Sequence, residues 1–279
     1  MNGIQLSVCI PGADAGPIVN AARLAESFNL DIWIGDPYGQ ARNCDDSYVM
    51  TTAAAAAAVT SHIRIGVFLT LSGSVEILRV AEDIGVVDQA SAGRLELGLV
   101  APGAAIEEWE SRARRLLGAW HDWPAGGDRR VSATPRPAQP WMSRLVAGEA
   151  GVIEIADRLR GGVVVLDEHA ASSVSSDTAQ RRVVMAVAPA MGDGGVRAWL
   201  ADRVLDAMVE LRDRADRLGA HEVLFPLPDA GPSGLVADLE ALGIVVGTSL
   251  RCARHKLEFL APDAWNWLTE LRHLHHAPQ

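Results

Sequence analysis

The alternation of short apolar runs with helix-periodic segments constrains the fold of this chain more than any other feature. In the first hundred residues, runs rich in leucine or β-branched side chains predict strands at 4–10, 30–35, 63–69 and 94–100. The segments between them space apolar side chains three and four positions apart, which predicts amphipathic helices at 17–28, 47–60 and 75–91. Strands joined through helices form right-handed βαβ units, so we expect a parallel sheet with helices outside it.

The second half of the chain continues this rhythm less regularly. It predicts strands at 144–147, 161–166, 183–188 and 221–227, and helices at 105–120, 149–159, 195–218 and 233–242. Eight parallel strands in about 250 residues favour a closed α/β fold, the (β/α)₈ TIM barrel. An open doubly wound sheet is the structural alternative, because periodicity does not distinguish the two. We expect residues 1–279 to form a single domain.

Two segments do not fit a minimal barrel. Residues 121–142 carry four prolines and two glycines, so we expect a loop or flexible excursion there instead of a regular element. After residue 243, the apolar run GIVVGTSL precedes a polar connector and a last predicted helix at 262–275. Residues 243–279 therefore form an atypical C-terminal segment to which we assign no role.

Composition narrows the classes of partner. Apolar residues make up 49% of the chain and the net charge is −10, so a large core is expected and nucleic acid or an anionic membrane is disfavoured. No apolar stretch approaches the roughly eighteen residues of a membrane helix. The N-terminal residues lack a secretory pattern, and Cys9, Cys44 and Cys252 are too scattered for a disulfide framework. We expect a cytoplasmic protein that binds small molecules or other proteins.

Three segments of the N-terminal part carry a recognisable pattern: residues 25–33, residues 54–66, and residues 87–94 (VDQASAGR) followed by a leucine-glycine strand. They resemble the bacterial luciferase-like family of flavin- and deazaflavin-dependent oxidoreductases, and residues 87–94 carry the resemblance best, because they match a distinctive local signature. The proline-rich run 135–140 resembles the family's approach to its fifth strand. The resemblance is good over residues 1–103, fair to about residue 165 and faint beyond.

The resemblance implies a TIM barrel that holds a flavin at the carboxyl ends of its strands, commonly as a dimer. It therefore implies FMN or coenzyme F420 as cofactor, and a homodimer. The signature itself has a structural interpretation. Ser91 and Gly93 suit a helix end followed by a turn, and Arg94 is placed to reach the last carbonyls or Asp88. We favour this scaffold role over catalysis.

Candidate site residues follow the predicted strands, because reactive groups of (β/α)₈ barrels lie at the strand carboxyl ends. The catalytic candidates are Asp36, Tyr38, Glu168 and His169. The cofactor-binding candidates are Gly12, Thr70, Leu71, Ser72, Val100, Gly148 and Glu149. In the family, a bulge that often contains a cis non-proline peptide follows the third strand and supports the flavin, which corresponds to residues 70–72 here.

The sequence also departs from the family pattern. F420-dependent dehydrogenases of the family usually have an aspartate and a proton-donating histidine after the second strand, whereas this chain has Asp36 and Pro37. Val100 lies in a turn where glycines are usual. Glu149 stands where the family often has a serine near the flavin phosphate, and a carboxylate there repels a second anion. The segment before the proline-rich run is short for a full substrate lid.

Other clusters have competing interpretations. Residues 167–169 (DEH) have the side chains for a general acid/base or for two metal ligands, and an acidic surface loop is the competing interpretation. We favour the surface loop and predict no metal site. Asp46 or Ser47 is expected to cap the alanine-rich helix. The histidines at 273–276 are expected to be terminal polar residues. Four tryptophans lie near the proline-rich run, and three roles are open for them: lining a substrate mouth, forming a subunit interface or filling the core. They are Trp109, Trp120, Trp123 and Trp141.

Three functional hypotheses remain open. The first is an oxidoreductase that uses FMN or F420 to activate oxygen or transfer a hydride to a small organic substrate. The second is a degenerate barrel that has lost its cofactor and acts as a non-catalytic binding or subunit-partner protein, suggested by Pro37, Val100 and Glu149. The third is an unrelated (β/α)₈ enzyme that uses Glu168 and His169.

Overall fold

Eight parallel strands close into a barrel in the computed structural model. The structure describes residues 5–10, 15–39, 46–72, 76–103, 105–120, 123–125, 129–140, 142–148, 151–166, 182–186, 213–227, 236–240 and 242. Its strands are β1 (Gln5–Ile10), β2 (Asp31–Ile34), β3 (Ile65–Leu69), β4 (Leu95–Val100), β5 (Trp123–Ala125), β6 (Arg129–Val131), β7 (Arg144–Ala147), β8 (Gly162–Val165), β9 (Val183–Ala186) and β10 (Glu222–Pro226). Its helices are α1 (Ala15–Ser27), α2 (Asp46–Val59), α3 (Ile77–Ala90), α4 (Ile106–Gly118) and α5 (Val152–Leu159).

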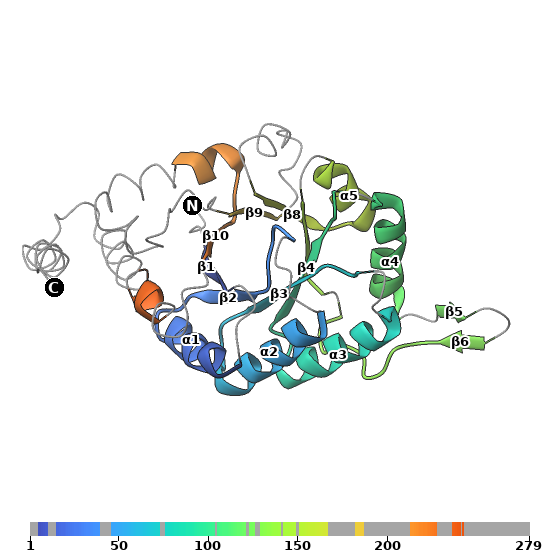
Figure 1. Ribbon diagram of the computed structural model, residues 1–279, viewed down its shortest axis with the longest axis horizontal. Coiled ribbons are helices and arrows are strands. Elements are labelled where there is room, and N and C mark those ends of the chain that lie inside the picture. Colours follow the sequence, from blue (N-terminus) through green and yellow to red (C-terminus); the bar gives the residue numbers. More distant parts are fainter. Residues whose placement is uncertain are drawn as a thin grey trace, which may run out of the picture.

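The strand order confirms the TIM barrel and excludes the open sheet. The strands run β1-β10-β9-β8-β7-β4-β3-β2 around a closed ring, and every neighbouring pair is parallel. Figure 1 shows this ring from one end, with α1 to α5 outside it. All eight predicted barrel strands form within two residues of their expected bounds. The ring brings the carboxyl ends of all eight strands to one end of the barrel.

The helices follow the predicted periodicity. The helices α1, α2 and α3 begin and end within two residues of the predicted bounds, and α4 ends at Gly118 instead of residue 120. Of the predicted helices at 195–218 and 233–242, residues 213–218, 236–240 and 242 are helical, and the remainder lies outside the described residues, as does 243–279. None of the described helices combines the length and apolar character needed to cross a membrane.

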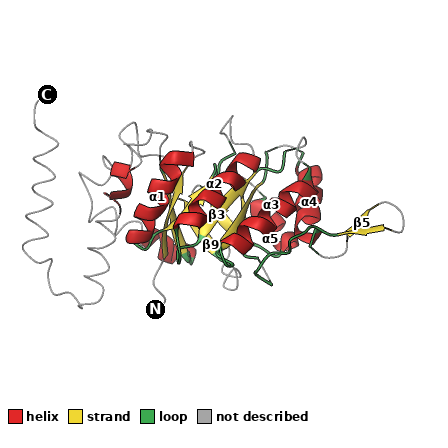
Figure 2. Ribbon diagram, turned by 90° about the horizontal axis from the view of Figure 1, so that it is seen from below, coloured by secondary structure: helices red, strands yellow, loops and turns green. Residues whose placement is uncertain are grey.

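The proline-rich segment contains regular structure, contrary to the prediction of a loop. The strands β5 and β6 pair antiparallel, with Trp123 opposite Val131. They form a two-stranded ribbon that extends away from the barrel beyond α4 (Figures 1 and 2). The prolines explain why periodicity missed it: Pro124 leaves only a three-residue strand, which is too short for an alternating pattern.

Side chains alternate between the barrel interior and the helix layer. Ile32 and Ile34 pack in the outer core with the helices, while Trp33 between them belongs to a separate interior cluster. The other members of this interior cluster are Cys9, Phe68, Val100, Leu145, Ala147, Val164, Leu166, Val184, Ala186 and Leu224. The barrel is therefore a packed core, and its larger side chains lie below the strand tips.

Two glycines make room for the largest interior rings. The Trp33 and Phe68 rings stack with centroids 4.8 Å apart. A Cβ atom on Gly66 would lie 2.1 Å from the Trp33 indole, and one on Gly98 would lie 2.4 Å from the Phe68 ring. Atoms cannot approach this closely, so the absence of a side chain at both positions allows the rings to lie inside the barrel.

The family-like signature acts as scaffold, as predicted. The helix α3 ends at Ala90, and Gly93 takes the left-handed conformation (φ +80°) that the following turn requires. The Arg94 guanidinium donates to the carbonyls of Ala57, Thr60, Ile63 and Ser91. Arg94 thus ties the end of α2 to the start of β4, and nothing in this arrangement calls for a catalytic role.

Candidate active site

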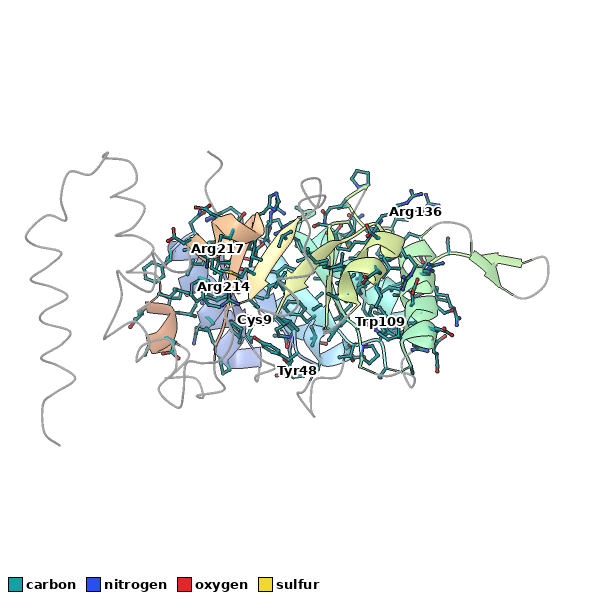
Figure 3. All side chains as sticks on the ribbon, turned by 90° about the horizontal axis from the view of Figure 1, so that it is seen from above. Cys9, Tyr48, Trp109, Arg136, Arg214 and Arg217 are labelled. Atoms are coloured by element: carbon teal, nitrogen blue, oxygen red, sulfur yellow. The ribbon has the colours of Figure 1, made fainter. Side chains whose placement is uncertain are left out.

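The described site candidates lie at the carboxyl ends of the strands. In Figure 3, Tyr48 and Trp109 lie toward the lower side of the barrel, whereas Arg136 and Arg217 lie toward the upper side. Residues 136–139 contact the start of β4, since Gln139 donates to the Leu95 carbonyl. The lower side in Figure 3 is therefore the end at which the strands finish and where the site is expected.

The tip of β3 forms a distinct backbone turn at the predicted bulge. Leu71 adopts a left-handed conformation (φ +51°), which residues with a Cβ atom rarely occupy. The expected cis peptide is not found within residues 70–72, since the only cis bond in the described stretches precedes Pro135. The Leu71 side chain packs into the outer core, and Ser72 is exposed. Because the Leu71 side chain is buried, a ligand at this tip would contact the backbone and the side chains of Thr70 and Ser72.

Two helices hold this tip by its main-chain atoms. The Asp46 carboxylate at the start of α2 accepts the N–H groups of Thr70 (2.8 Å) and Leu71 (2.9 Å). From α4, the Trp109 indole donates to the Thr70 carbonyl (3.1 Å), and Arg112 donates to the Leu71 and Ser72 carbonyls (3.0 and 2.6 Å). Sequence reasoning missed these contacts, because it considered Asp46 only as a helix cap and Trp109 only as a mouth, interface or core residue.

The tip of β2 is a short polar turn beside the interior cluster. The Asp36 carboxylate accepts the Tyr38 backbone N–H (2.8 Å), which is an Asx turn. The half-buried Tyr38 ring packs against the interior cluster, and Pro37 is buried. A Cβ on Gly39 would lie 3.1 Å from the Val100 side chain. Tyr38 and Val100 therefore lie at the same part of the barrel end. The Asp36 carboxylate, in contrast, accepts a backbone hydrogen bond within its own turn.

The tips of β4 and β7 approach each other closely. The Ala101 N–H donates to the Ala147 carbonyl (2.8 Å), and a Cβ on Gly148 would lie 3.2 Å from the Ala101 Cβ. Val100 is buried in the interior cluster beside the small side chains Ala147 and Ala186. Since these side chains are short and apolar, the described part of the barrel interior below these strand ends is nonpolar.

Four predicted site residues cannot be placed. Gly12, Glu149, Glu168 and His169 lie outside the described residues. In the stretches that the structure describes, no three His, Cys, Asp or Glu side chains gather as a metal site would require. Of the tryptophans, Trp109 and Trp120 are buried in the outer core.

The sequence of the barrel's first half decides the family. Residues 5–142 match the profile of the luciferase-like monooxygenase family, which includes β1 to β4 and the β5–β6 ribbon. Residues 5–142 belong to this family. No curated protein matches the chain in sequence.

Solved structures with the same luciferase-like fold cover most of this chain. The monooxygenase RslO1 from Streptomyces bottropensis is 18% identical, with 86% of this chain and 98% of that chain covered and a TM-score of 0.62. The FMN complex of the oxygenating constituent of 3,6-diketocamphane monooxygenase from Pseudomonas putida is 13% identical (88% and 98% covered, TM-score 0.61). An F420-dependent secondary alcohol dehydrogenase with an F420-acetone adduct is 12% identical (87% and 98% covered, TM-score 0.59). The TM-scores show a shared fold, and at these low identities the likeness extends to the fold alone.

The opposite end of this luciferase-like barrel holds a network of buried charges. Arg182, just before β9, donates to both carboxylate oxygens of Glu96 (2.6 Å each) and also pairs with Glu222. Glu222 accepts the Trp33 indole N–H (2.9 Å) and the Ser7 hydroxyl. The network links β1, β2, β4, β9 and β10, and it closes the amino-terminal end of the barrel.

At this amino-terminal end of the barrel, burial and neighbouring charges shift the pKa values of Asp31 and Arg182. Burial raises the pKa of Asp31 to about 6, and Glu222 and Glu96 add to this effect, whereas the hydrogen bond from the Arg64 N–H opposes it. Burial alone would lower the pKa of Arg182, but the charges of Glu96 and Glu222 raise it above its ordinary value. Arg182 therefore stays charged, and Asp31 is the group that gains or loses a proton near neutrality.

We expect Asp31→Asn to stabilise the protein above pH 6. The folded chain holds the Asp31 proton up to a pKa of about 6, against 3.8 as the reference value, so stability is lost as the pH rises through this window. The variant removes this loss, which amounts to at most about 3 kcal/mol. Its amide oxygen still accepts the Arg64 N–H, and Gln5 can turn its amide to match. Urea unfolding between pH 4 and 8 measures the effect.

Glu26→Gln is the control of opposite sign. Burial acts to raise the pKa of Glu26, but hydrogen bonds from the Ser61 and His62 N–H groups outweigh it and lower that pKa. Its contribution is present above the reference pKa and is lost as the pH falls. The control should therefore be less stable than the wild type at neutral pH. An Asp31→Asn variant whose stability follows the wild-type pH dependence would contradict the assignment.

Proposed function

We propose that this chain is a flavin-type oxidoreductase that acts on a small organic substrate at the carboxyl ends of its barrel strands. Within that class we favour reduced FMN and oxygen over F420 and hydride transfer. When bound, reduced FMN supplies two electrons to dioxygen, of which one atom enters the substrate and the other leaves as water. As in the family generally, we expect the working form to be a homodimer in the cytoplasm.

The observation that carries the proposal is the backbone turn at residues 70–72. It lies at the position where the family supports its flavin, and its left-handed Leu71 makes a protrusion at the end of β3. Five of its main-chain groups, the N–H groups of Thr70 and Leu71 and the carbonyls of residues 70–72, are bonded to α2 and α4. A turn with these polar groups already satisfied suits contact with the apolar face of a flat heterocyclic ring.

The surroundings favour oxygen chemistry over hydride transfer. Pro37, which has no titratable group, stands where F420-dependent dehydrogenases of the family usually have a proton donor. The Asp36 carboxylate is bonded to the Tyr38 N–H, and the nearby interior side chains Val100, Ala147 and Ala186 are nonpolar. A nonpolar surface limits access of water to the reduced coenzyme. In this proposal Tyr38, which packs against this interior cluster, orients the substrate.

Binding measurements with both coenzymes test the proposal. We expect oxidised FMN fluorescence to be quenched saturably at micromolar protein, and reduced FMN to bind in anaerobic calorimetry. F420 should bind more weakly than FMN. Light scattering of the same samples tests the homodimer. If neither FMN, in either redox state, nor F420 binds saturably, the oxidoreductase proposal fails and the degenerate barrel becomes the better interpretation.

A further inference from the structure

We propose that Asp46, Trp109 and Arg112 are positioning residues that set the coenzyme affinity of the 70–72 turn without touching the coenzyme. The inference rests on the proposed function, because it assigns the turn a ligand. It goes beyond that function by identifying two helices, α2 and α4, as the elements that fix the shape of the turn.

The first contact comes from α2. Asp46 is 2% exposed, and its two carboxylate oxygens accept separate backbone N–H groups, Oδ1 from Thr70 and Oδ2 from Leu71. A carboxylate that accepts two main-chain donors fixes the orientation of both peptide planes. No other residue type of this size offers two acceptors in this geometry, because asparagine replaces one oxygen with a donor.

The second set of contacts comes from α4, where two side chains one turn apart donate three hydrogen bonds. Trp109 and Arg112 are three positions apart and therefore face the same side of the helix. The indole N–H of Trp109 meets the Thr70 carbonyl, and the Arg112 guanidinium spans the carbonyls of Leu71 and Ser72. The N–H groups of Thr70 and Leu71 are thus bonded to α2, and the carbonyls of residues 70–72 are bonded to α4.

The conformation of Leu71 explains why such holding is needed. A leucine in the left-handed region is disfavoured by contact between its Cβ atom and its own backbone, so the turn relaxes unless other groups fix it. The buried Leu71 side chain provides part of this restraint, and the five hydrogen bonds from α2 and α4 provide the rest. Loosening them should change the turn and therefore the surface that meets the ring.

Asp46→Asn and Arg112→Met are the test variants. Asp46→Asn keeps the side-chain volume but points a donor at one of the two N–H groups. Arg112→Met keeps most of the apolar stem and removes the donors to Leu71 and Ser72. Arg79→Met is the matched control, because Arg79 lies on α3, is mostly exposed, and pairs only with Asp83 among the described contacts. Arg112→Lys, which retains one charged donor, tests rescue.

Two measurements are made on each full-length protein: the dissociation constant for FMN and the hydrogen exchange rate of the Leu71 amide. We expect Asp46→Asn and Arg112→Met to weaken FMN binding about tenfold, which is what the loss of one hydrogen bond to a charged group produces. We expect faster Leu71 exchange in both, partial recovery in Arg112→Lys, and no change in Arg79→Met.

The outcomes separate this inference from the proposed function. If the wild type binds FMN and both variants bind it equally well, the positioning role is wrong and the proposed function stands. The role is also wrong if affinity falls while Leu71 exchange is unchanged. If the wild type binds neither FMN nor F420, the proposed function fails and the positioning role fails with it. A melting temperature near that of Arg79→Met shows that a variant is folded.

Discussion

Replacing Arg182 with methionine is expected to lower the free energy of unfolding by about 3–5 kcal/mol at pH 7, the cost of leaving buried charge without its partner. Arg182 is the shared counterion of Glu96 and Glu222, whose side chains are 4% and 1% exposed. Without the guanidinium, both carboxylates remain inside the barrel next to Asp31. Chemical unfolding at pH 7 measures the loss. The loss should shrink in acid, where the carboxylates take up protons.

Arg64→Met is the matched control. Arg64 also pairs with Glu96, but its side chain is 53% exposed, so its removal should cost at most about 1 kcal/mol. Glu96 keeps both of its hydrogen bonds to Arg182 in this variant. Equal destabilisation by the two substitutions would mean that the network does not depend on Arg182 in particular.

Adding a single methyl group at Gly66 is expected to destabilise the barrel by about 3 kcal/mol, because a well-packed core cannot absorb the added volume. The new Cβ would lie 2.1 Å from the Trp33 indole, which is itself fixed by Phe68 and Glu222. Gly66→Ala should also alter the tryptophan fluorescence, because the indole has to move. Thermal and urea unfolding measure the stability change.

A second substitution shows whether Trp33 is the cause. Trp33→Phe reduces the ring that the new methyl meets, so the Gly66→Ala/Trp33→Phe double variant should be more stable than the sum of the single effects predicts, by about 1 kcal/mol or more. Gly103→Ala is the control, since a Cβ there meets nothing within 4 Å and should leave stability nearly unchanged. Strict additivity in the double variant would show that the overlap is relieved elsewhere.

The strands and helices were predictable because burial on one or both faces leaves a periodic pattern in the sequence. The strands β1 to β4 are mostly apolar and are buried on both faces, as expected for strands between a packed interior and a helix layer. One part of the scaffold role of Arg94 was also predictable, because Ser91 lies only three positions away at the end of α3. Its bonds to Ala57, Thr60 and Ile63 span 31 to 37 positions and were not predicted. Closure of the ring was inferred from the strand count and confirmed by the pairing of β1 with β10.

The contacts that shape the candidate site were not predictable, because they join residues far apart in sequence. Asp46 lies 25 positions from Leu71, and Arg112 lies 41 positions from it, so no local pattern links them. The same holds at the opposite end of the barrel, where Arg182 meets Glu96 across 86 positions. The sequence offered only a weak signal for the contacts at the candidate site, namely Asp46 at the start of a predicted helix and Trp109 and Arg112 three positions apart on another.

The contacts to main-chain atoms at the tip of β3 have a consequence for how this protein changes over evolution. Any amino acid except proline presents the same N–H group to Asp46 at position 70, and every residue presents the same carbonyls to Trp109 and Arg112. These main-chain contacts are therefore kept when the side chain at position 70 or 72 is exchanged, although an exchange at Thr70 also removes the bond from its hydroxyl to Asp46 (3.3 Å). Under the proposed function, substitutions at these two positions would change the side chains that face the substrate while the backbone turn is retained.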